Sequence, residues 1–268
     1  MAETRLSMPG LVGLKREGRR LVMLTCYDAL FARLLEQAGI DLLLVGDSVN
    51  EVLAGRRSTL SATLDQMIYH AASVRRGTDR ALVVVDLPFL AYQVSVEEAI
   101  RHAGRILAET DCHAVKLEGG RVMVPTVAAL TARGIPVVAH LGLTPQSIHG
   151  LGGYRVQGRS PVDAERLRAD ALALQEAGAS AIVLELLPQG LAREISASLT
   201  IPTIGIGSGA GCDGQVLVLH DMLGLNEGFA PKFLRHYAEL AGVVRDAAGR
   251  YADEVRAGEY PGPDHAFD

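Results

Sequence analysis

The sequence predicts an α/β fold in which eight parallel strands and their helices close into a (β/α)8 barrel, the TIM barrel. Eight short runs rich in Val, Ile and Leu recur along the 268 residues, as is typical of strands buried on both faces. Most intervals between the runs carry apolar residues at helical spacing. Eight such alternations in roughly 250 residues match the size of this barrel. The runs are residues 20–28, 41–48, 81–88, 113–120, 135–142, 180–188, 201–209 and 215–223.

Predicted helices occupy most of the intervals between these runs. The segment 95–109 begins at Ser95 and has Glu98 three residues later, which is the pattern of a capping box. The other predicted helices are residues 29–39, 63–77, 162–178 and, after the last run, most of 231–257.

A single barrel domain is expected over residues 1–268, with a short helical segment before the barrel and helices and a tail after it. No linker or low-complexity tract divides the chain. An open, doubly wound sheet is the alternative fold. Such sheets usually have fewer strands, and the first run is not followed by the GxGxxG pattern of their dinucleotide-binding forms.

Composition and charge narrow the classes of function. The net charge is −5 and charged residues make up 21% of the chain. No basic block is larger than residues 15–20, so we expect no nucleic-acid partner. No segment reaches the roughly 18 apolar residues of a membrane helix, so no membrane partner is expected. The three cysteines are far apart and form no CxxC pattern, which fits a protein of the reducing cytoplasm.

Charged and polar side chains gather where the predicted strands end, and in a TIM barrel these carboxyl ends carry the chemistry. Side chains alternate along a strand, so Lys116 and Glu118 face one side while Val115 and Leu117 face the helices. The charged pair, and Glu185 by the same argument, is predicted to point into the barrel. The candidates are Asp47 and Ser48 after the second run, Asp86 in the third, Lys116 and Glu118 in the fourth, His140 in the fifth, Glu185 in the sixth, and His220 and Asp221 in the eighth.

Several acids at one barrel mouth indicate a metal ion. Buried charges cost several kcal/mol each unless they are paired or bound to metal. Carboxylates and water are the ligands of Mg²⁺, which keeps positions open for a chelating substrate. Zinc is disfavoured because its usual Cys and His ligands are not clustered.

The glycine-rich segment 205–211 is either a phosphate-binding loop or a tight turn.

Each candidate also has a simpler interpretation when it is taken alone. Asp47 or Asp86 can cap a following turn, Lys116 and Glu118 can form a structural ion pair, and His140 can be a core histidine. The joint pattern favours a functional site more strongly than any single residue does.

With these residues assembled, the sequence resembles the ketopantoate hydroxymethyltransferase family from about Met8 to Phe267. The resemblance implies a TIM barrel that transfers a hydroxymethyl group from the co-substrate 5,10-methylenetetrahydrofolate to 3-methyl-2-oxobutanoate. The product is 2-dehydropantoate, in pantothenate biosynthesis, formed through a Mg²⁺-stabilised enolate. The resemblance also implies one Mg²⁺ per subunit and a homo-oligomer, a decamer. The motifs that carry it are TCYD, LLVGDS, STL, DLPF.AY, VKLEGG, AHLGLTPQSIHGLGGYRVQGR, VLE..P, IPTIGIGSG..CDGQVLV.HD and PKF.

The resemblance implies a role for most of the candidate residues. Asp47 and Asp86 match the direct Mg²⁺ ligands, and Glu118 matches the residue that completes the metal site, in part through water. Asp47, Ser48, Asp86 and Lys116 match the contacts to the 2-oxo acid. The family's usual pattern is not kept in the loop after the second run, residues 49–61, where Val-Asn-Glu, an arginine before STL and a serine after it replace the common residues.

Glu185 matches the family's proton acceptor, and His140 lies in the family's pocket motif.

Two alternative functions stay open. A Mg²⁺-dependent carbon–carbon lyase or mutase of 2-oxo acids would use a similar barrel without folate, but usually carries a reactive cysteine in a short loop. A non-catalytic keto-acid-binding barrel would be favoured by loss of an acidic ligand or of Glu185, and all of these residues are present.

Overall fold

A computed structural model describes residues 6–267 of the chain. The chain divides into two compact units, Met1–Val218 and Leu219–Asp268, and each is described by itself. The expectation of a single domain over residues 1–268 stays a prediction.

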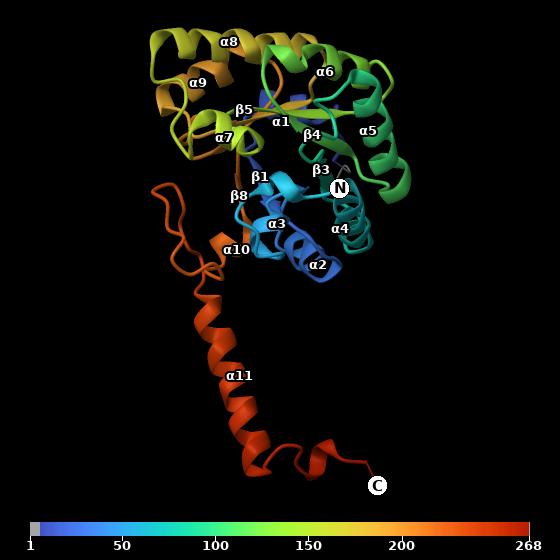
Figure 1. Ribbon diagram of the computed structural model, residues 1–268, viewed down its shortest axis with the longest axis vertical. Coiled ribbons are helices and arrows are strands. Elements are labelled where there is room, and N and C mark those ends of the chain that lie inside the picture. The colour runs from blue at the N-terminus through green and yellow to red at the C-terminus, as the bar shows by residue number, and fades with distance from the viewer. Residues whose placement is uncertain (1–5, 268) are drawn as a thin grey trace. The chain divides into compact units, whose positions relative to one another are not determined.

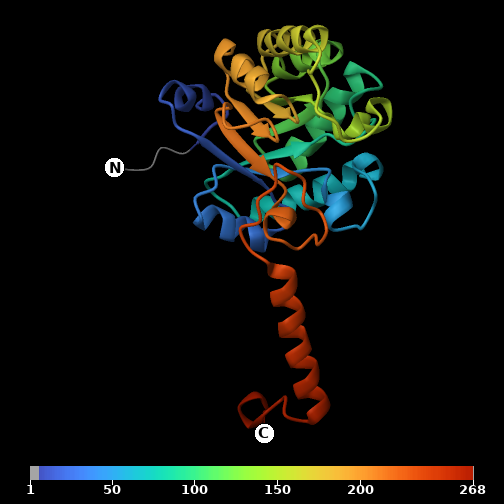
Figure 2. The same cartoon turned by 90° about the vertical axis from the view of Figure 1, so that its left-hand side faces the viewer.

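The first unit contains a closed barrel of eight strands in sequence order (Figure 1, Figure 2). Neighbouring strands are parallel, and β1 closes the barrel against β8. The predicted (β/α)8 fold class is therefore confirmed, and every predicted run contains a strand. The strands are β1 (Leu21–Thr25), β2 (Leu42–Val45), β3 (Leu82–Asp86), β4 (Ala114–Glu118), β5 (Val137–Gly142), β6 (Ala181–Glu185), β7 (Thr203–Ile206) and β8 (Gly214–Leu217).

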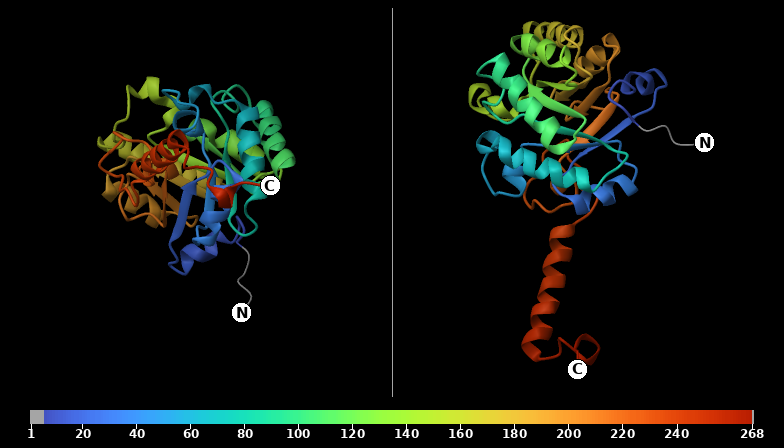
Figure 3. Two further views of the ribbon diagram at one scale, coloured as in Figure 1. Left: turned by 90° about the horizontal axis from the view of Figure 1, so that it is seen from below. Right: turned by 90° about the vertical axis from the view of Figure 1, so that its right-hand side faces the viewer.

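Helices cover the outside of the strands in the first unit (Figure 3). The predicted cap of α5 is present, because the Ser95 hydroxyl accepts the Glu98 N–H at 3.1 Å. The α-helices are α1 (Leu11–Arg16), α2 (Ala29–Gln37), α3 (Val49–Val52), α4 (Leu64–Arg76), α5 (Val96–Thr110), α6 (Val124–Thr131), α7 (Ile148–Leu151), α8 (Pro161–Glu176) and α9 (Gln189–Ser198). Short 3-10 turns are η1 (Thr59–Ser61), η2 (Arg121–Met123) and η3 (Pro145–Ser147).

An apolar layer fills the barrel toward the amino-terminal ends of its strands. All of its members are buried, and on each strand they are spaced two residues apart, as inward-facing side chains must be. The candidate site lies next to this buried layer, toward the carboxyl ends of the strands. Its strand residues are Leu21, Met23, Leu42, Leu44, Leu82, Val84, Ala114, Val138, Ala181, Val183, Ile204 and Val216.

The end of the eighth predicted run differs from the expectation. His220 and Asp221 do not end a strand, because β8 stops at Leu217 and both residues lie on α10 (Leu219–Met222) of the second unit. A continuous apolar run cannot by itself separate the end of a strand from the first turn of a helix.

The second unit is also less helical than predicted. Its long helix α11 spans Leu240–Ala257, and a 3-10 turn, η4 (Pro263–His265), follows it. Residues 231–239 are not helical, although the sequence predicted helix through most of 231–257. Backbone bonds around this segment go to the end of α10 instead: Tyr237 N–H donates to Met222 O at 2.9 Å and Leu240 N–H donates to Leu223 O at 3.0 Å.

Candidate active site

The candidate site is a polar layer that lies directly above the apolar layer, at the carboxyl ends of the strands. Because side chains alternate, the residue two positions after a core residue faces the interior again. Val84 is followed in this way by Asp86 on β3, and Ala114 by Lys116 on β4. The predicted inward orientation agrees with this alternation. The polar side chains that β3 to β6 contribute are Asp86, Lys116, Glu118, His140 and Glu185.

Lys116 and Asp86 form a buried ion pair between neighbouring strands. The two residues are register partners of β3 and β4, and Lys116 Nζ lies 2.6 Å from Asp86 Oδ1. Only 6% and 4% of their side chains are exposed. Burial acts to lower the pKa of Lys116, but the surrounding carboxylates, Asp86 first, outweigh it and raise that pKa. The ammonium group is therefore held in its charged form.

Asp47 is the acid of the layer whose negative charge is the least favoured. It follows β2, and its backbone N–H donates to Asp86 Oδ2 at 3.0 Å. Burial raises the pKa of its carboxyl well above the usual range, and the charges of Asp86 and Glu118 raise it further. Lys116 opposes this effect without cancelling it. Asp47, Asp86 and Glu118 thus place three acids around the Lys116 ammonium group.

Ser48 and Gly46 shape the end of β2. The Ser48 hydroxyl lies 2.9 Å from the phenol oxygen of Tyr27, which is buried. A Cβ on Gly46 would approach Ser48 Oγ to 2.8 Å and Asp86 Oδ2 to 3.6 Å. A side chain at position 46 would therefore intrude on two of the predicted substrate contacts.

His140 lies between two carboxylates. Its Nδ1 is 3.4 Å from Glu118 Oε1 and its Nε2 is 3.2 Å from Glu185 Oε2, although neither contact has hydrogen-bond geometry. Burial and the charge of Lys116 oppose protonation of the ring, but the two carboxylates outweigh them and raise the pKa of His140 to about 9. His140 is therefore not an ordinary core histidine satisfied by backbone groups.

Glu118 is stabilised as a carboxylate. Burial alone would raise its pKa, but the contact with His140 and the charges of His140 and Lys116 hold that pKa below its usual value. Glu118 and Asp47 are thus shifted in opposite directions within one layer.

Gln146 and Tyr92 belong to the same site, and sequence reasoning missed both. Gln146 Nε2 donates to Asp47 Oδ2 at 2.9 Å, and its backbone N–H donates to Glu118 Oε2 at 2.9 Å. The Tyr92 hydroxyl donates to Gln146 Oε1 at 2.7 Å and accepts the Glu118 N–H at 3.0 Å. Both residues lie in loops outside the apolar runs. Their signal in the sequence is a polar side chain soon after a strand, in the segments DLPFLAY and GLTPQS.

The chemistry of the donors fits a divalent cation. Within residues 6–267 no group of three or more His, Cys, Asp or Glu side chains is already arranged to hold a metal ion. Asp47, Asp86 and Glu118 nevertheless supply three buried carboxylates, the oxygen ligands that Mg²⁺ prefers. Burial and, after it, the charges of Asp86 and Glu118 raise the pKa of Asp47, and a bound dication would offset both effects.

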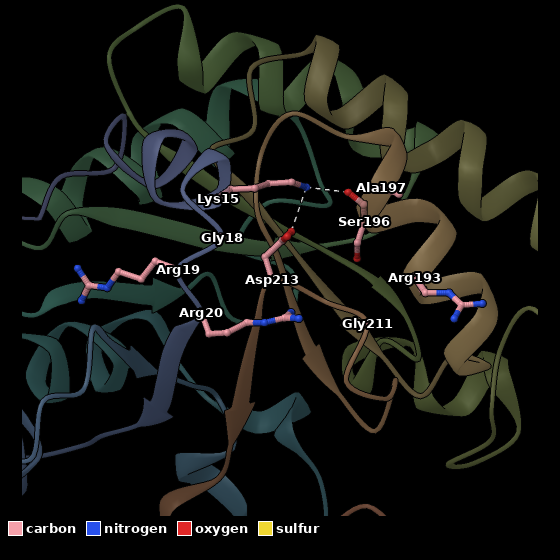
Figure 4. Close-up of a pocket in the computed structure, with 9 residues that line it drawn as sticks. All are labelled: Lys15, Gly18, Arg19, Arg20, Arg193, Ser196, Ala197, Gly211 and Asp213. Atoms are coloured by element: carbon pink, nitrogen blue, oxygen red, sulfur yellow. Dashed lines mark hydrogen bonds and ion pairs between the residues drawn. The ribbon is translucent and has the colours of Figure 1, made fainter.

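A cavity lies at the opposite end of the strands from the candidate site (Figure 4). Its volume is about 300 Å³, and none of the predicted site residues lines it. Lys15 Nζ fixes this end by donating to Ser196 O at 2.7 Å and pairing with Asp213 at 3.0 Å. The residues that line it are Lys15, Gly18, Arg19, Arg20, Arg193, Ser196, Ala197, Gly211 and Asp213.

The glycine-rich segment 205–211 runs into β8 without an intervening helix. A phosphate-binding loop of the predicted kind needs a helix N-terminus to receive the anion. The glycines instead allow close packing on α9, because a Cβ on Gly209 or Gly211 would lie within 2.6 Å or 2.7 Å of the side chain of Gln189 or Arg193. This close packing favours the tight-turn interpretation.

The three cysteines are free and buried. Burial raises the pKa of Cys26 to about 12 and that of Cys112 to about 11, and it also raises the pKa of Cys212. Such thiols are poor nucleophiles.

Among the helices within residues 6–267, none has the length and apolar character needed to cross a bilayer.

The chain is a TIM-barrel protein with a cluster of acidic residues at the carboxyl ends of its strands, and similar solved structures share this fold. Phosphoenolpyruvate phosphomutase from Streptomyces platensis subsp. rosaceus is similar with a TM-score of 0.64 and 14% identity, over 98% of this chain and 92% of that one. 2,3-Dimethylmalate lyase, a member of the PEP mutase/isocitrate lyase superfamily, is similar with a TM-score of 0.60 and 18% identity, over 97% and 93%. At these identities the likeness concerns the fold alone.

Sequence relatives identify the family. Residues 5–263 match the profile of the ketopantoate hydroxymethyltransferases. The 3-methyl-2-oxobutanoate hydroxymethyltransferase of Pelobacter propionicus is 54% identical over 98% of this chain and 97% of its own. That of Prosthecochloris aestuarii is 55% identical over 95% and 93%. The chain belongs to the ketopantoate hydroxymethyltransferase family, and the prediction that it is an enzyme of this kind is confirmed.

Proposed function

We propose that the chain transfers a hydroxymethyl group from 5,10-methylenetetrahydrofolate to 3-methyl-2-oxobutanoate and releases 2-dehydropantoate. The observation that carries this proposal is the buried layer of Asp47, Asp86, Lys116 and Glu118 beneath Glu185. It occurs in a chain whose relatives bear the name of this activity over nearly their whole length.

Asp47, Asp86 and Glu118 would hold Mg²⁺. When bound, Mg²⁺ supplies Lewis acidity to the 2-oxo acid. Lys116 keeps a positive charge beside Asp86 in a site with little water, where it stabilises negative charge on the substrate more than it would in bulk solvent. Ser48, at the end of β2, donates a hydrogen bond to the substrate carboxylate.

Glu185 accepts the proton from C3 of the substrate. Its side chain is 13% exposed, against 3% for both His140 and Glu118, so it is the acid of this group with the best access to a bound ligand. His140 orients Glu185 from the side of the barrel. The C3–H bond breaks, and the resulting enolate attacks the methylene carbon of the folate. That carbon is bonded to two folate nitrogens: the attack breaks one of these bonds, and the second breaks as water supplies the hydroxyl oxygen. The proton taken from C3 and one proton of the water go to the two nitrogens, and tetrahydrofolate leaves.

The lyase or mutase alternative shares the fold but lacks support at the site. It calls for a reactive cysteine, and the three thiols of this chain are buried with raised pKa values. The non-catalytic alternative is weakened because every proposed acid is present in the layer. We also propose, from the family resemblance, that the enzyme works in the cytoplasm as a homo-oligomer, a decamer with one Mg²⁺ per subunit.

The test is formation of 2-dehydropantoate from 3-methyl-2-oxobutanoate, measured with every component present and with methylenetetrahydrofolate or Mg²⁺ left out. We expect product only in the complete mixture. Consumption of the 2-oxo acid without folate would favour the lyase or mutase. Binding of the 2-oxo acid without turnover in any mixture would favour the non-catalytic barrel.

A further inference from the structure

Gln146 is the residue that joins the separate parts of the polar layer. It lies in η3, just after β5, and is buried. Its side-chain amide donates to Asp47 Oδ2 at 2.9 Å and to Leu87 O at 3.0 Å. Its backbone N–H donates to Glu118 Oε2 at 2.9 Å. One residue thus holds two carboxylates that come from different strands.

The orientation of this amide is fixed by its surroundings. Gln146 Oε1 accepts from the Tyr92 hydroxyl at 2.7 Å and from Gln93 Nε2 at 2.9 Å. Nε2 faces two acceptors, Asp47 Oδ2 and Leu87 O. A flipped amide would place oxygen against oxygen at Asp47 and nitrogen against the Gln93 amide, so the surrounding groups select a single arrangement.

Gln146 restrains the two acids without adding charge. Asp47 and Glu118 are both buried, and their like charges repel one another. A lysine or arginine in this place would hold the carboxylates but would cancel their attraction for a cation. A neutral donor holds them and leaves the negative charge of the layer available.

The geometry points to Gln146 as a positioning residue that fixes Asp47 and Glu118 for binding of a divalent cation. This inference rests on the proposed function, because it presupposes that these acids hold Mg²⁺. Partners that orient metal-ligating side chains typically contribute 10-fold to 100-fold in metal affinity. The side chain of Gln146 restrains Asp47, whereas its backbone N–H restrains Glu118 and is kept in the variant that tests the role of the side chain.

The test compares Gln146→Met with the unchanged protein by calorimetric titration of Mg²⁺ in the absence of both substrates. Methionine keeps the approximate length of the side chain and removes the amide. We expect the Kd for Mg²⁺ to rise by about 10-fold or more. The melting temperature in a chelator reports any purely structural effect separately. Gln215→Met is the matched control, because Gln215 is exposed on β8 and its amide donates to Gly209 O; its Kd is expected to stay unchanged.

The outcomes separate this role from the proposed function. If the unchanged protein binds no Mg²⁺, both the metal site and this role are lost. If the unchanged protein binds Mg²⁺ and Gln146→Met binds it equally well, Gln146 is structural and the inference is overturned while the function stands. Should Gln146→Met fail to fold, Tyr92→Phe removes the hydroxyl that orients the amide. Its Kd is then expected to rise several-fold, and an unchanged Kd would overturn the inference.

Discussion

At the scale of single residues, the buried pair of Lys116 and Asp86 can serve the stability of the fold, the chemistry of the site, or both. Two opposite charges 2.6 Å apart in the barrel compensate each other, yet apolar residues of similar volume can often replace such a pair without loss of stability. The pair is therefore better explained by the chemistry of the barrel mouth than by the stability of the fold.

This explanation predicts different results for one and for two substitutions. Lys116→Met alone leaves the Asp86 charge buried and unpaired, and we expect it to lower the free energy of unfolding by about 3–5 kcal/mol. The double variant Lys116→Met/Asp86→Leu should regain most of that stability but show no turnover. Urea unfolding and the product assay measure the two effects. A double variant that keeps its activity would remove both residues from the mechanism.

At the scale of elements, the loop after β2 carries its own internal support. This loop, residues 49–61, is where the sequence is expected to depart from the family's usual pattern. Buried Asn50 donates from Nδ2 to Ser58 O and to Ser61 Oγ, each at 2.8 Å. Asn50 and Ser61 are two of the residues expected to differ, and a direct hydrogen bond joins them.

A double-mutant cycle checks this coupling. Asn50→Ala is expected to lower the free energy of unfolding by about 1–3 kcal/mol, because it leaves Ser58 O and Ser61 Oγ without their donor. Once Asn50 is alanine, Ser61→Ala should cost less than it does in the unchanged protein, with a coupling energy of about 0.5–1.5 kcal/mol. Additive effects of the two substitutions would show that the hydrogen bond contributes nothing.

Glu36 on α2 holds the segment before β3, residues 78–81, through hydrogen bonds. Its Oε1 accepts from the Thr78 hydroxyl and from the N–H groups of Asp79, Arg80 and Ala81. Burial acts to raise its pKa, but these four donors outweigh it and hold the pKa below its ordinary value of 4.5.

Because the pKa of Glu36 is lowered in the folded state, its contribution to stability is present above pH 4.5 and is lost as the pH falls through the folded-state value. Glu36→Gln should therefore lower the free energy of unfolding by about 1 kcal/mol at pH 7, allowing for partial exposure. The difference from the unchanged protein should shrink in acid. Denaturant unfolding at a series of pH values measures it, and a difference that grows toward low pH would contradict the assignment.

At the scale of the whole molecule, the parts predictable from sequence are those fixed by burial and alternation. The barrel follows from eight apolar runs, and the inward direction of Lys116 and Glu118 follows from their two-residue spacing. Gln146 and Tyr92 were not predicted, because they reach the mouth from loops whose course depends on tertiary contacts. His220 was misplaced because apolar residues continue without a break from β8 into α10.

The proposed activity of the molecule depends on Glu185 as the base that removes the C3 proton. The most direct measurement is proton NMR of the exchange of that proton of 3-methyl-2-oxobutanoate into D2O, with Mg²⁺ present and folate absent. The unchanged protein should catalyse the exchange. Glu185→Gln should keep binding of Mg²⁺ and of the 2-oxo acid but exchange the proton at least about 100-fold more slowly. Exchange at an unchanged rate in a variant that still binds both would contradict the assignment of Glu185.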